Sequence, residues 1–553
     1  MGILVRRRLC ATALLVTLAP PLALAETCTG LCLQQVTCPN PAVTTTVSGR
    51  VYAPNGVDPL PGVLVYVPNA PVEDLPAGAT CRNGGTPPTA PLVQAITRPD
   101  GTFSVRNMPV GTNIPLVIQS GKWRRQIVIS NVPSCTNTAL IAAKTRFPRN
   151  QSEGDMPNFA IVTGGVDSQE CILRKIGIAD TEFSSPSGTG HVKLYAGAGF
   201  PGATFPTSTS ETALVSSSAV LNGYDMVIFA CQGAAYSPTS GAQQNLIDYA
   251  NAGGRVMATH YAYTWLYNVA PFSGTATWAP ETVDISADPQ IAYIDQSMPD
   301  GLQLAQSLLQ VGASTTQGQI MLNTLRHDFT AVTPPSELWI SLNDPVAGIV
   351  PMQYTFDTPV GTSPEDQCGR VDFMDFHVAD ASSNGTTFPQ ECTPGMTPQE
   401  KLFEYMVFNL TNNQGVPLVL TVDDKRDFAR YGNIATYTVN FANHTNKDLA
   451  DGATVTITLS AGLDAANATC IGLPGSGTAN CVLSGPNTFT ASASIVGSSN
   501  QATWVITVPV LPASTDTTVQ MDAITTGAVP ATDVDTLVQF HDGFDVPNAD
   551  GAQ

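Results

Sequence analysis

Two histidines occupy positions in this chain at which side chains of an α/β protein commonly meet a ligand. His260 follows the apolar run 256–258, and His377 closes the segment 369–377 (GRVDFMDFH). Both segments are typical of buried strands in a parallel sheet. The carboxyl ends of such strands lie at one edge of the sheet, where open α/β sheets bind ligands. We therefore predict that the two imidazoles share one crevice, where they are the candidate catalytic residues.

Cys231 ends a third run of this kind, 226–230 (MVIFA), and Gln232 comes directly after it. A thiolate beside an imidazole base would be a nucleophile for covalent catalysis. In an exported protein, however, a cysteine is more often bridged, and Cys171 is a candidate partner. We expect the bridged form, in a crevice that Gln232 also lines.

A mixed set of imidazole and carboxylate ligands would suit zinc or another divalent transition metal. His260 and His377 could form such a set with Asp375 or Asp380. The sequence has no H-E-x-x-H or similarly close spacing, and a pair of hydrogen-bonded histidines in a polar crevice explains the pattern more simply. We favour that pair and expect no cofactor, and we keep a divalent transition metal as the alternative.

Aromatic residues cluster after His260, at Tyr261, Tyr263, Trp265 and Tyr267. Aromatic faces with polar tips suit sugars and other amphipathic ligands. The same side chains could instead pack against a neighbouring helix or the segment that follows, and we favour packing. The candidate ligand-binding residues are Tyr261, Tyr263, Trp265, Cys231, Gln232 and Asp380.

The N-terminus predicts export. Three arginines precede the apolar stretch 9–18, and the sequence Ala-Leu-Ala at 23–25 completes the pattern of a secretory signal peptide over 1–25. No later stretch reaches the ~20 apolar residues of a membrane-spanning helix. The net charge is −20, and −23 without the leader arginines, which argues against nucleic acid as a partner. We expect a secreted or cell-surface protein.

Eleven of the twelve cysteines follow the leader. Export makes disulfides the default, and the odd number implies one free thiol or an intermolecular bond. Cys470 and Cys481 are close enough to brace one hairpin, and Cys368 and Cys392 bracket one loop. The segment 26–45 is better explained as a disulfide-tied N-terminal segment than as a zinc site. The candidate disulfide-forming residues are Cys81, Cys135, Cys171, Cys231, Cys368, Cys392, Cys470 and Cys481.

Residues 46–145 alternate β-rich and turn-like stretches, which predicts a small β-sandwich. Two stretches are more specific, 59–63 (PLPGV) and 98–105 (RPDGTFSV), where an Asp-Gly turn precedes a strand that buries Phe103 and Val105. They resemble the carboxypeptidase regulatory-like family. The resemblance implies a transthyretin-like sandwich, a carbohydrate-binding-like fold and an accessory role.

After a polar linker at 146–157, apolar runs alternate with helical stretches, which indicates a parallel sheet with helices on both faces. The block 158–412 resembles the class I glutamine amidotransferase-like superfamily, in its trehalose-utilisation-type branch. The segment 253–260 (GGRVMATH) corresponds to the family's nucleophile strand, and 369–377 to its catalytic-histidine strand. The resemblance implies a flavodoxin-like α/β domain. Residues 270–360 form an insertion without an assigned place.

These two motifs lack the residues that carry out catalysis in the family. His260 stands where the nucleophilic cysteine is expected, and Val378 and Ala379 replace the rest of the family's His-x-Glu pair after His377. Since covalent catalysis needs a thiolate or hydroxyl beside a base, we expect no glutamine hydrolysis.

Residues 416–541 again contain β-rich stretches, as residues 46–145 do, and a tail follows at 542–553. The stretches 437–441 (YTVNF) and 455–462 (VTITLSAG) resemble the immunoglobulin-like conserved repeat domain of bacterial surface proteins. The resemblance implies a C-terminal Ig-like β-sandwich with a stalk or adhesion role. The fold we expect is therefore a multidomain one, with a transthyretin-like sandwich, a flavodoxin-like parallel sheet and an Ig-like sandwich in that order.

The function we expect is that of a secreted or cell-surface binding or structural protein with a noncatalytic crevice. A glycan or another cell-envelope component is the candidate partner. The alternative is an exported hydrolase that uses His260 and His377, with or without a divalent transition metal.

Overall fold

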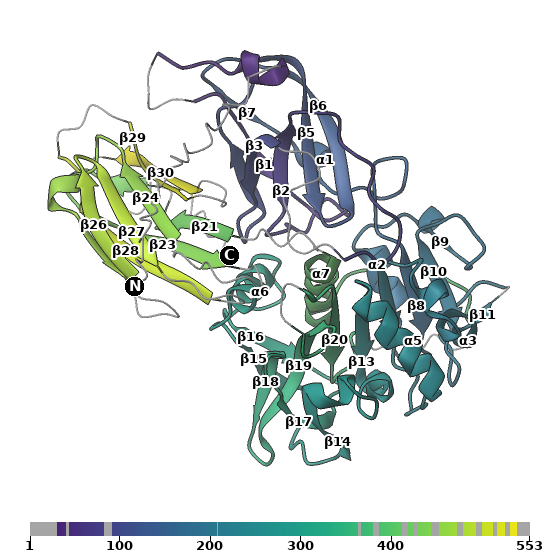
Figure 1. Cartoon of the computed structure of the whole chain (residues 1–553). Helices are drawn as coiled ribbons and strands as arrows, with labels where there is room; N and C mark the ends of the chain where they lie inside the picture. The colour runs from purple at the N-terminus through teal and green to yellow at the C-terminus, as the bar shows by residue number, and fades with distance from the viewer. Residues whose placement is uncertain are drawn as a thin grey trace, which may run out of the picture.

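A computed structural model describes most of the chain. The described residues are 30–39, 44–81, 91–206, 208–362, 366–379, 386–411, 418–424, 426, 428–443, 453–472, 479–493, 500–512, 517–525 and 531–538. The expected signal peptide, Asp380 and the C-terminal tail lie outside them. Within them, six sheets occupy three successive regions of the chain (Figure 1). This confirms a β-rich architecture with several sheets, while the domain types remain predictions.

Residues 46–139 form two small sheets, with the strand orders β4-β1-β7 and β3-β2-β5-β6. The strands are β1 (Thr46–Arg50), β2 (Leu64–Pro68), β3 (Pro91–Ile96), β4 (Thr102–Val105), β5 (Gly111–Ser120), β6 (Trp123–Val132) and β7 (Asn137–Ala139). A short 3-10 helix, η1 (Gly30–Gln34), precedes them, and α1 (Ala142–Thr145) follows. Phe103 and Val105 are buried, as the sequence predicted. We call this region the N-terminal sheet pair.

The central region is one large sheet with the path β11-β10-β8-β12-β13-β20-β19-β18-β15-β16. Its parallel part comprises β8 (Phe159–Thr163), β10 (Val192–Ala196), β11 (Thr209–Ser210), β12 (Met226–Phe229), β13 (Arg255–Thr259) and β20 (Gly369–Met374), with the short β9 (Phe183–Ser184) beside β10. Numbered along the chain from β8, the strands β10-β8-β12-β13-β20 have the order 2-1-3-4-5, which occurs in flavodoxin-like doubly wound sheets. The expected parallel sheet is thus present.

The unplaced insertion extends this sheet. It contains η4 (Phe272–Thr275), β14 (Ala276–Thr282), β15 (Gln290–Ile294), α6 (Pro299–Gln310), β16 (Gln319–Leu322), β17 (His327–Val332), β18 (Glu337–Asp344) and β19 (Gly348–Thr358). Strand β19 pairs antiparallel with β20, and β18, β15 and β16 continue outward from it. Strands β14 and β17 form a separate two-stranded antiparallel sheet. The insertion therefore extends the sheet beyond β20 with the antiparallel strands β19, β18, β15 and β16.

Both faces of the parallel sheet are covered, because successive side chains of a strand point to opposite faces. Ile161 and Met257 pack on one face with α2 (Gln169–Lys175) and α7 (Pro398–Thr411). The other face packs against α3 (Glu211–Val215), α4 (Ser218–Leu221) and α5 (Ser240–Asn251). Two further 3-10 helices are η2 (Asp180–Glu182) and η3 (His260–Trp265).

The N-terminal sheet pair and the central sheet share one hydrophobic core. Trp123 of β6 lies 5.3 Å from Phe408 of α7 and 6.1 Å from Phe159 of β8, measured between ring centroids. The disulfide Cys81–Cys368 joins the same two regions covalently. These regions therefore pack as one unit rather than as separate modules.

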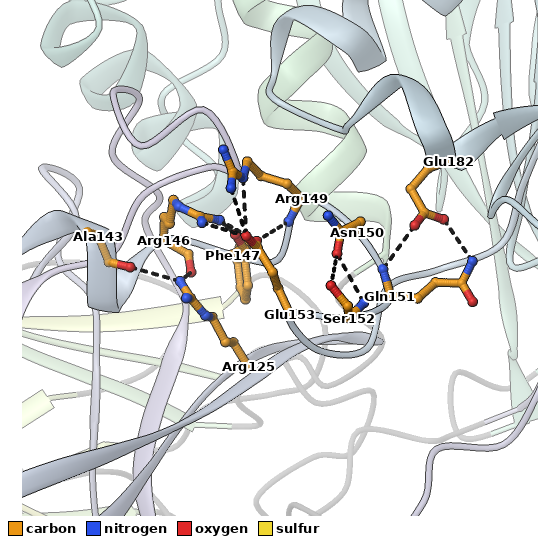
Figure 2. Close-up of polar contacts among 10 residues, drawn as sticks. All are labelled: Arg125, Ala143, Arg146, Phe147, Arg149, Asn150, Gln151, Ser152, Glu153 and Glu182. Atoms are coloured by element: carbon orange, nitrogen blue, oxygen red, sulfur yellow. Dashed lines mark hydrogen bonds and ion pairs between the residues drawn. The ribbon is translucent and has the colours of Figure 1, made fainter.

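The expected polar linker is a well-connected turn (Figure 2). Glu153 accepts hydrogen bonds from the guanidinium of Arg146 at 2.6 and 2.8 Å and from Arg149 at 2.9 to 3.3 Å. Gln151 binds both carboxylate oxygens of Glu182 at 3.0 Å. The bonds to Glu182 hold the linker to the central region, and Arg125 of β6, which donates to the carbonyl of Arg146 at 3.0 Å, holds it to the N-terminal sheet pair.

The C-terminal region has a core of its own. One of its sheets has the order β21-β23-β28-β25, and the other has the order β22-β30-β29-β24-β27-β26. The elements are β21 (Leu418–Asp423), β22 (Phe428–Arg430), β23 (Ile434–Asn443), β24 (Ala453–Leu459), η6 (Ala465–Asn467), β25 (Thr469–Gly472), β26 (Ala479–Gly485), β27 (Thr488–Ala493), β28 (Asn500–Pro509), β29 (Thr518–Ile524) and β30 (Ala531–Val538). Arg106 binds Asp522 at 3.1 Å and Gln520 at 2.9 Å, so this region contacts the N-terminal sheet pair.

Four disulfides link described cysteines, which fits an extracellular environment. They are Cys38–Cys135, Cys81–Cys368, Cys171–Cys392 and Cys470–Cys481. The expected Cys470–Cys481 bridge is confirmed. The expected pairing across the 368–392 loop is wrong, because each of those two cysteines faces a partner from another element. No helix among the described residues is long and apolar enough to span a membrane.

Candidate functional site

The register of the sheet brings the sequence-predicted residues to one edge. Phe229 of β12 is paired with Ala258 of β13, which is paired in turn with Phe373 of β20. Cys231 and His260 each follow two residues after their paired strand position, and His377 follows shortly after the end of β20. Three chain segments that are distant in the sequence thus end side by side.

His260 occupies a sharp turn between β13 and η3. Its φ is +51°, in the left-handed region that few residues other than glycine adopt. Strained strand-to-helix turns of this kind present a side chain above the sheet edge in hydrolases. His260 therefore lies at a strained turn directly after β13.

Cys231 is the free cysteine among the described residues, and it is fully buried. Its Sγ lies 3.2 Å from Nδ1 of His260. The expected bridge to Cys171 is wrong, because Cys171 lies on α2 and is bonded to Cys392. Gly164, at the end of β8, lets the chain pass close to Cys231, since a Cβ there would lie 1.9 Å from the Cys231 carbonyl oxygen.

His377 completes the cluster. Its ring centroid lies 4.1 Å from that of His260, and both histidines are 7% exposed. The backbone of His377 donates to the carbonyl of Thr324, and its own carbonyl accepts from the side chain of Gln399 on α7. The two imidazoles therefore lie against each other at this edge of the sheet, and the ligand-binding crevice that we expected there stays a prediction.

Asp167, which was not predicted from the sequence, accepts hydrogen bonds from residues beside both histidines. One carboxylate oxygen accepts from the hydroxyl of Thr259 at 2.8 Å and from Gln169 at 2.9 Å. The other accepts from the backbone N–H groups of Val378 and Ala379 at 3.3 and 2.8 Å. Thr259 precedes His260 and Val378 follows His377, so this one buried carboxylate ties together the two segments that carry the imidazoles.

The insertion contributes Arg326, a second residue that sequence reasoning missed. Its guanidinium lies 4.0 Å from the ring centre of Tyr261 and forms two hydrogen bonds to Asp328, at 2.6 and 2.7 Å. Asp375, a predicted metal ligand, accepts from the backbone N–H of Asp328 at 2.6 Å. Burial and the neighbouring Asp328 raise the pKa of Asp375 well above its usual range.

The thiol of Cys231 and the imidazole of His260 both favour their neutral forms. Burial, with a smaller effect of the Asp167 charge, raises the pKa of Cys231 to about 12. Burial, followed by the effects of His377 and Arg326, lowers the pKa of His260 well below its usual value. A thiolate–imidazolium pair, the form that covalent catalysis needs, is therefore unfavourable here. Neutral imidazoles and a sulfur are, however, the donor set of a transition-metal site.

The other candidate ligand-binding residues are largely packed. Trp265 is 3% exposed and packs against Phe229 with ring centroids 4.4 Å apart, and Tyr263 is 3% exposed. Gln232 accepts from the backbone N–H of Gly199 at 2.7 Å and thereby braces a loop. Tyr261 alone of the aromatic candidates is half-buried beside His260. Packing, the favoured interpretation of these aromatic residues, fits these positions.

No protein-family model matches the chain, and no curated protein matches it. Among solved structures, a ThuA-like protein from Bacteroides uniformis ATCC 8492 aligns with 45% of this chain and 90% of its own, at 13% identity and a TM-score of 0.25. The C-terminal domain of the Streptococcus agalactiae AgI/II polypeptide BspA aligns with 23% of this chain and 51% of its own, at 13% identity and a TM-score of 0.18.

A cohesin module from a Clostridium perfringens ATCC13124 family 33 glycoside hydrolase aligns with 22% of this chain and 98% of its own, at 10% identity and a TM-score of 0.17. The match to the streptococcal domain spans about half of that domain's length. Likenesses at this level assign neither a family nor a function.

Proposed function

We propose that this chain is an exported binding or structural protein of the cell surface, whose amidotransferase-like domain binds a ligand at the crevice without hydrolysing glutamine. The proposal rests on which residue lies at the turn directly after β13. His260 stands at the strained turn, and the nearest thiol lies on the neighbouring strand with its pKa raised to about 12. The nucleophile of the family's mechanism is thus missing from its place.

The ligand class that we propose is a glycan of the cell envelope. Tyr261 supports it, because a half-buried aromatic ring at a crevice suits the apolar face of a sugar. The neighbouring Arg326 could donate hydrogen bonds to sugar hydroxyls, since a guanidinium carries several donors. The disulfides support the localisation, because bridges of this number persist in oxidising compartments.

Retention on isolated envelope fractions and on a panel of immobilised glycans tests this function. Tyr261→Ala should weaken glycan binding about 3- to 10-fold, the range that one aromatic contact supplies. Tyr293→Ala is the matched control, because Tyr293 is an exposed tyrosine on β15, in the insertion. A wild-type protein that binds neither glycan nor envelope would overturn the proposal, as would ammonia release from glutamine that Cys231→Ala abolishes.

A second candidate is an exported hydrolase that works through His260 and His377. The distance of 4.1 Å between their ring centroids favours it, because both imidazoles can reach one substrate atom. It predicts that His260→Ala and His377→Ala each abolish the same hydrolytic activity while the melting temperature changes little. If either variant keeps that activity, this candidate fails.

A further inference from the structure

We infer that Cys231, His260 and His377 form a binding site for a single transition-metal ion, with Zn²⁺ as the ion that we commit to. One ligand atom from each residue lies within 4.8 Å of the other two, and all three side chains are buried. The sequence alone suggested the two histidines with Asp375 or Asp380. Among the described residues, the third donor near both imidazoles is the sulfur of Cys231.

The spacing of the donors is close to what a zinc ion needs. With Zn–S near 2.3 Å and Zn–N near 2.0–2.1 Å, a tetrahedral site holds its ligand atoms about 3.3–3.6 Å apart. Sγ of Cys231 and Nδ1 of His260 are already 3.2 Å apart. The remaining pairs lie within 4.8 Å, so a contraction on the order of 1 Å by side-chain rotation would close the site.

The supporting structure is rigid. The three ligands follow the ends of β12, β13 and β20, which are adjacent in the sheet. Asp167 fastens the residues beside both histidines, and Gln399 holds the backbone of His377. Metal sites depend on such supporting hydrogen bonds, whose loss typically weakens binding 10- to 100-fold.

The nearby charges tolerate a cation. Arg326 is a positive group whose charge acts on His260, and its guanidinium is neutralised by two hydrogen bonds to Asp328. The carboxylate of Asp167 adds negative charge near Cys231 at the same edge of the sheet. A thiolate ligand would further reduce the net charge of the bound ion, because the metal displaces the thiol proton.

This inference goes beyond the proposed function, since a metal can bind whether or not the crevice engages a glycan. A sulfur ligand beside two imidazoles gives the site a preference for zinc or copper over magnesium or calcium, which prefer oxygen. With three protein ligands, the set also corresponds to metal sites that keep one position open for water or substrate.

The test is metal analysis of the full exported protein, purified without metal-affinity tags or chelators. We expect about one zinc per chain by elemental analysis. After removal of zinc, titration with Co²⁺ should give a thiolate-to-cobalt charge-transfer absorption in the near ultraviolet. One copper per chain in place of zinc would overturn the assignment of the ion.

Cys231→Ser should abolish the charge-transfer band and weaken Co²⁺ binding at least about 100-fold, because it removes a direct ligand. His377→Ala should weaken binding to a similar degree. His191→Gln is the control, since His191 pairs with Glu182 away from the cluster and should leave binding unchanged. Circular dichroism and melting temperature verify that each variant is folded.

The inference is overturned if the wild type binds Co²⁺ no more tightly than Cys231→Ser, or if the spectrum lacks a sulfur band. If a variant does not fold, the wild-type stoichiometry and spectrum still decide the question. Because glycan binding is assayed separately with Tyr261→Ala, failure of the metal site and failure of the proposed function give different results.

Discussion

His260 presents its Nδ1 3.2 Å from Sγ of Cys231, from a backbone turn with φ of +51°. The pair resembles a catalytic cysteine–histidine dyad in distance, but not in electrostatics. Burial favours the neutral thiol and the neutral imidazole, so that the pair lacks the charge separation of an activated nucleophile.

This relationship predicts a slow-reacting thiol. In protein treated with a chelator, iodoacetamide should label Cys231 at least about 100-fold more slowly than it labels a free cysteine in a peptide, because the thiolate is rare and the sulfur is buried. Mass spectrometry of the native and the guanidinium-unfolded protein, both without reductant, measures the rate. Rapid native labelling would show an accessible thiolate and contradict the neutral pair.

A second prediction concerns Asp167. Asp167→Ala should lower the free energy of unfolding by about 2–4 kcal/mol, because it leaves buried N–H and O–H donors without their acceptor. Urea unfolding measures the change. Asp180→Ala is the control and should cost about 0–1 kcal/mol, since Asp180 pairs with Arg174 at the surface. Equal effects of the two substitutions would show that Asp167 is not a structural link.

Strands β8, β12, β13 and β20 of the parallel sheet were predictable, because their apolar runs are local signals. The run 159–163 matches β8 residue for residue, and 226–230 differs from β12 by one residue. The full lengths of β5 and β6 are harder to predict from the sequence. Pro115 interrupts the pattern of β5, and the cross-strand pairing with β6, which extends both strands to ten residues, is not visible in either one alone.

The site was predictable only where strand ends determine it. His260 and His377 follow directly from the rule that parallel strands end at one edge. Whether Cys231 is a free thiol or part of a disulfide could not be deduced from the sequence. The pairing of cysteines depends on which of them the folded chain brings together. Arg326 lies in an insertion whose antiparallel pairing to β20 is a tertiary feature. Asp167 had one local signal, an acidic residue just after the end of β8.

A third prediction compares two disulfides. Removing Cys81–Cys368 with a double serine substitution should destabilise the unit formed by the first two regions by roughly 4–5 kcal/mol, since the bridge spans 287 residues. Removing Cys470–Cys481, which spans 11 residues, should cost about 3 kcal/mol and affect the C-terminal region alone. Differential scanning calorimetry separates the two transitions. The idea that the first two regions form one cooperative unit would fail if the first double substitution left their transition unchanged.

The fourth prediction concerns pH and the linker network (Figure 2). Hydrogen bonds from Arg146, opposed by burial and reinforced by Arg149, hold the pKa of Glu153 well below its usual range. A carboxyl with a lowered folded-state pKa contributes stability above its unfolded pKa, and this contribution is lost as the pH falls below that value. Glu153→Gln should therefore destabilise the protein by about 1–3 kcal/mol at pH near 7, and the difference from wild type should shrink in acid. Urea unfolding of both proteins at neutral and acidic pH measures it, with Asp248→Asn, at an exposed carboxylate of α5, as the control. A difference that stays constant with pH would mean that the side chain acts through packing rather than through its charge.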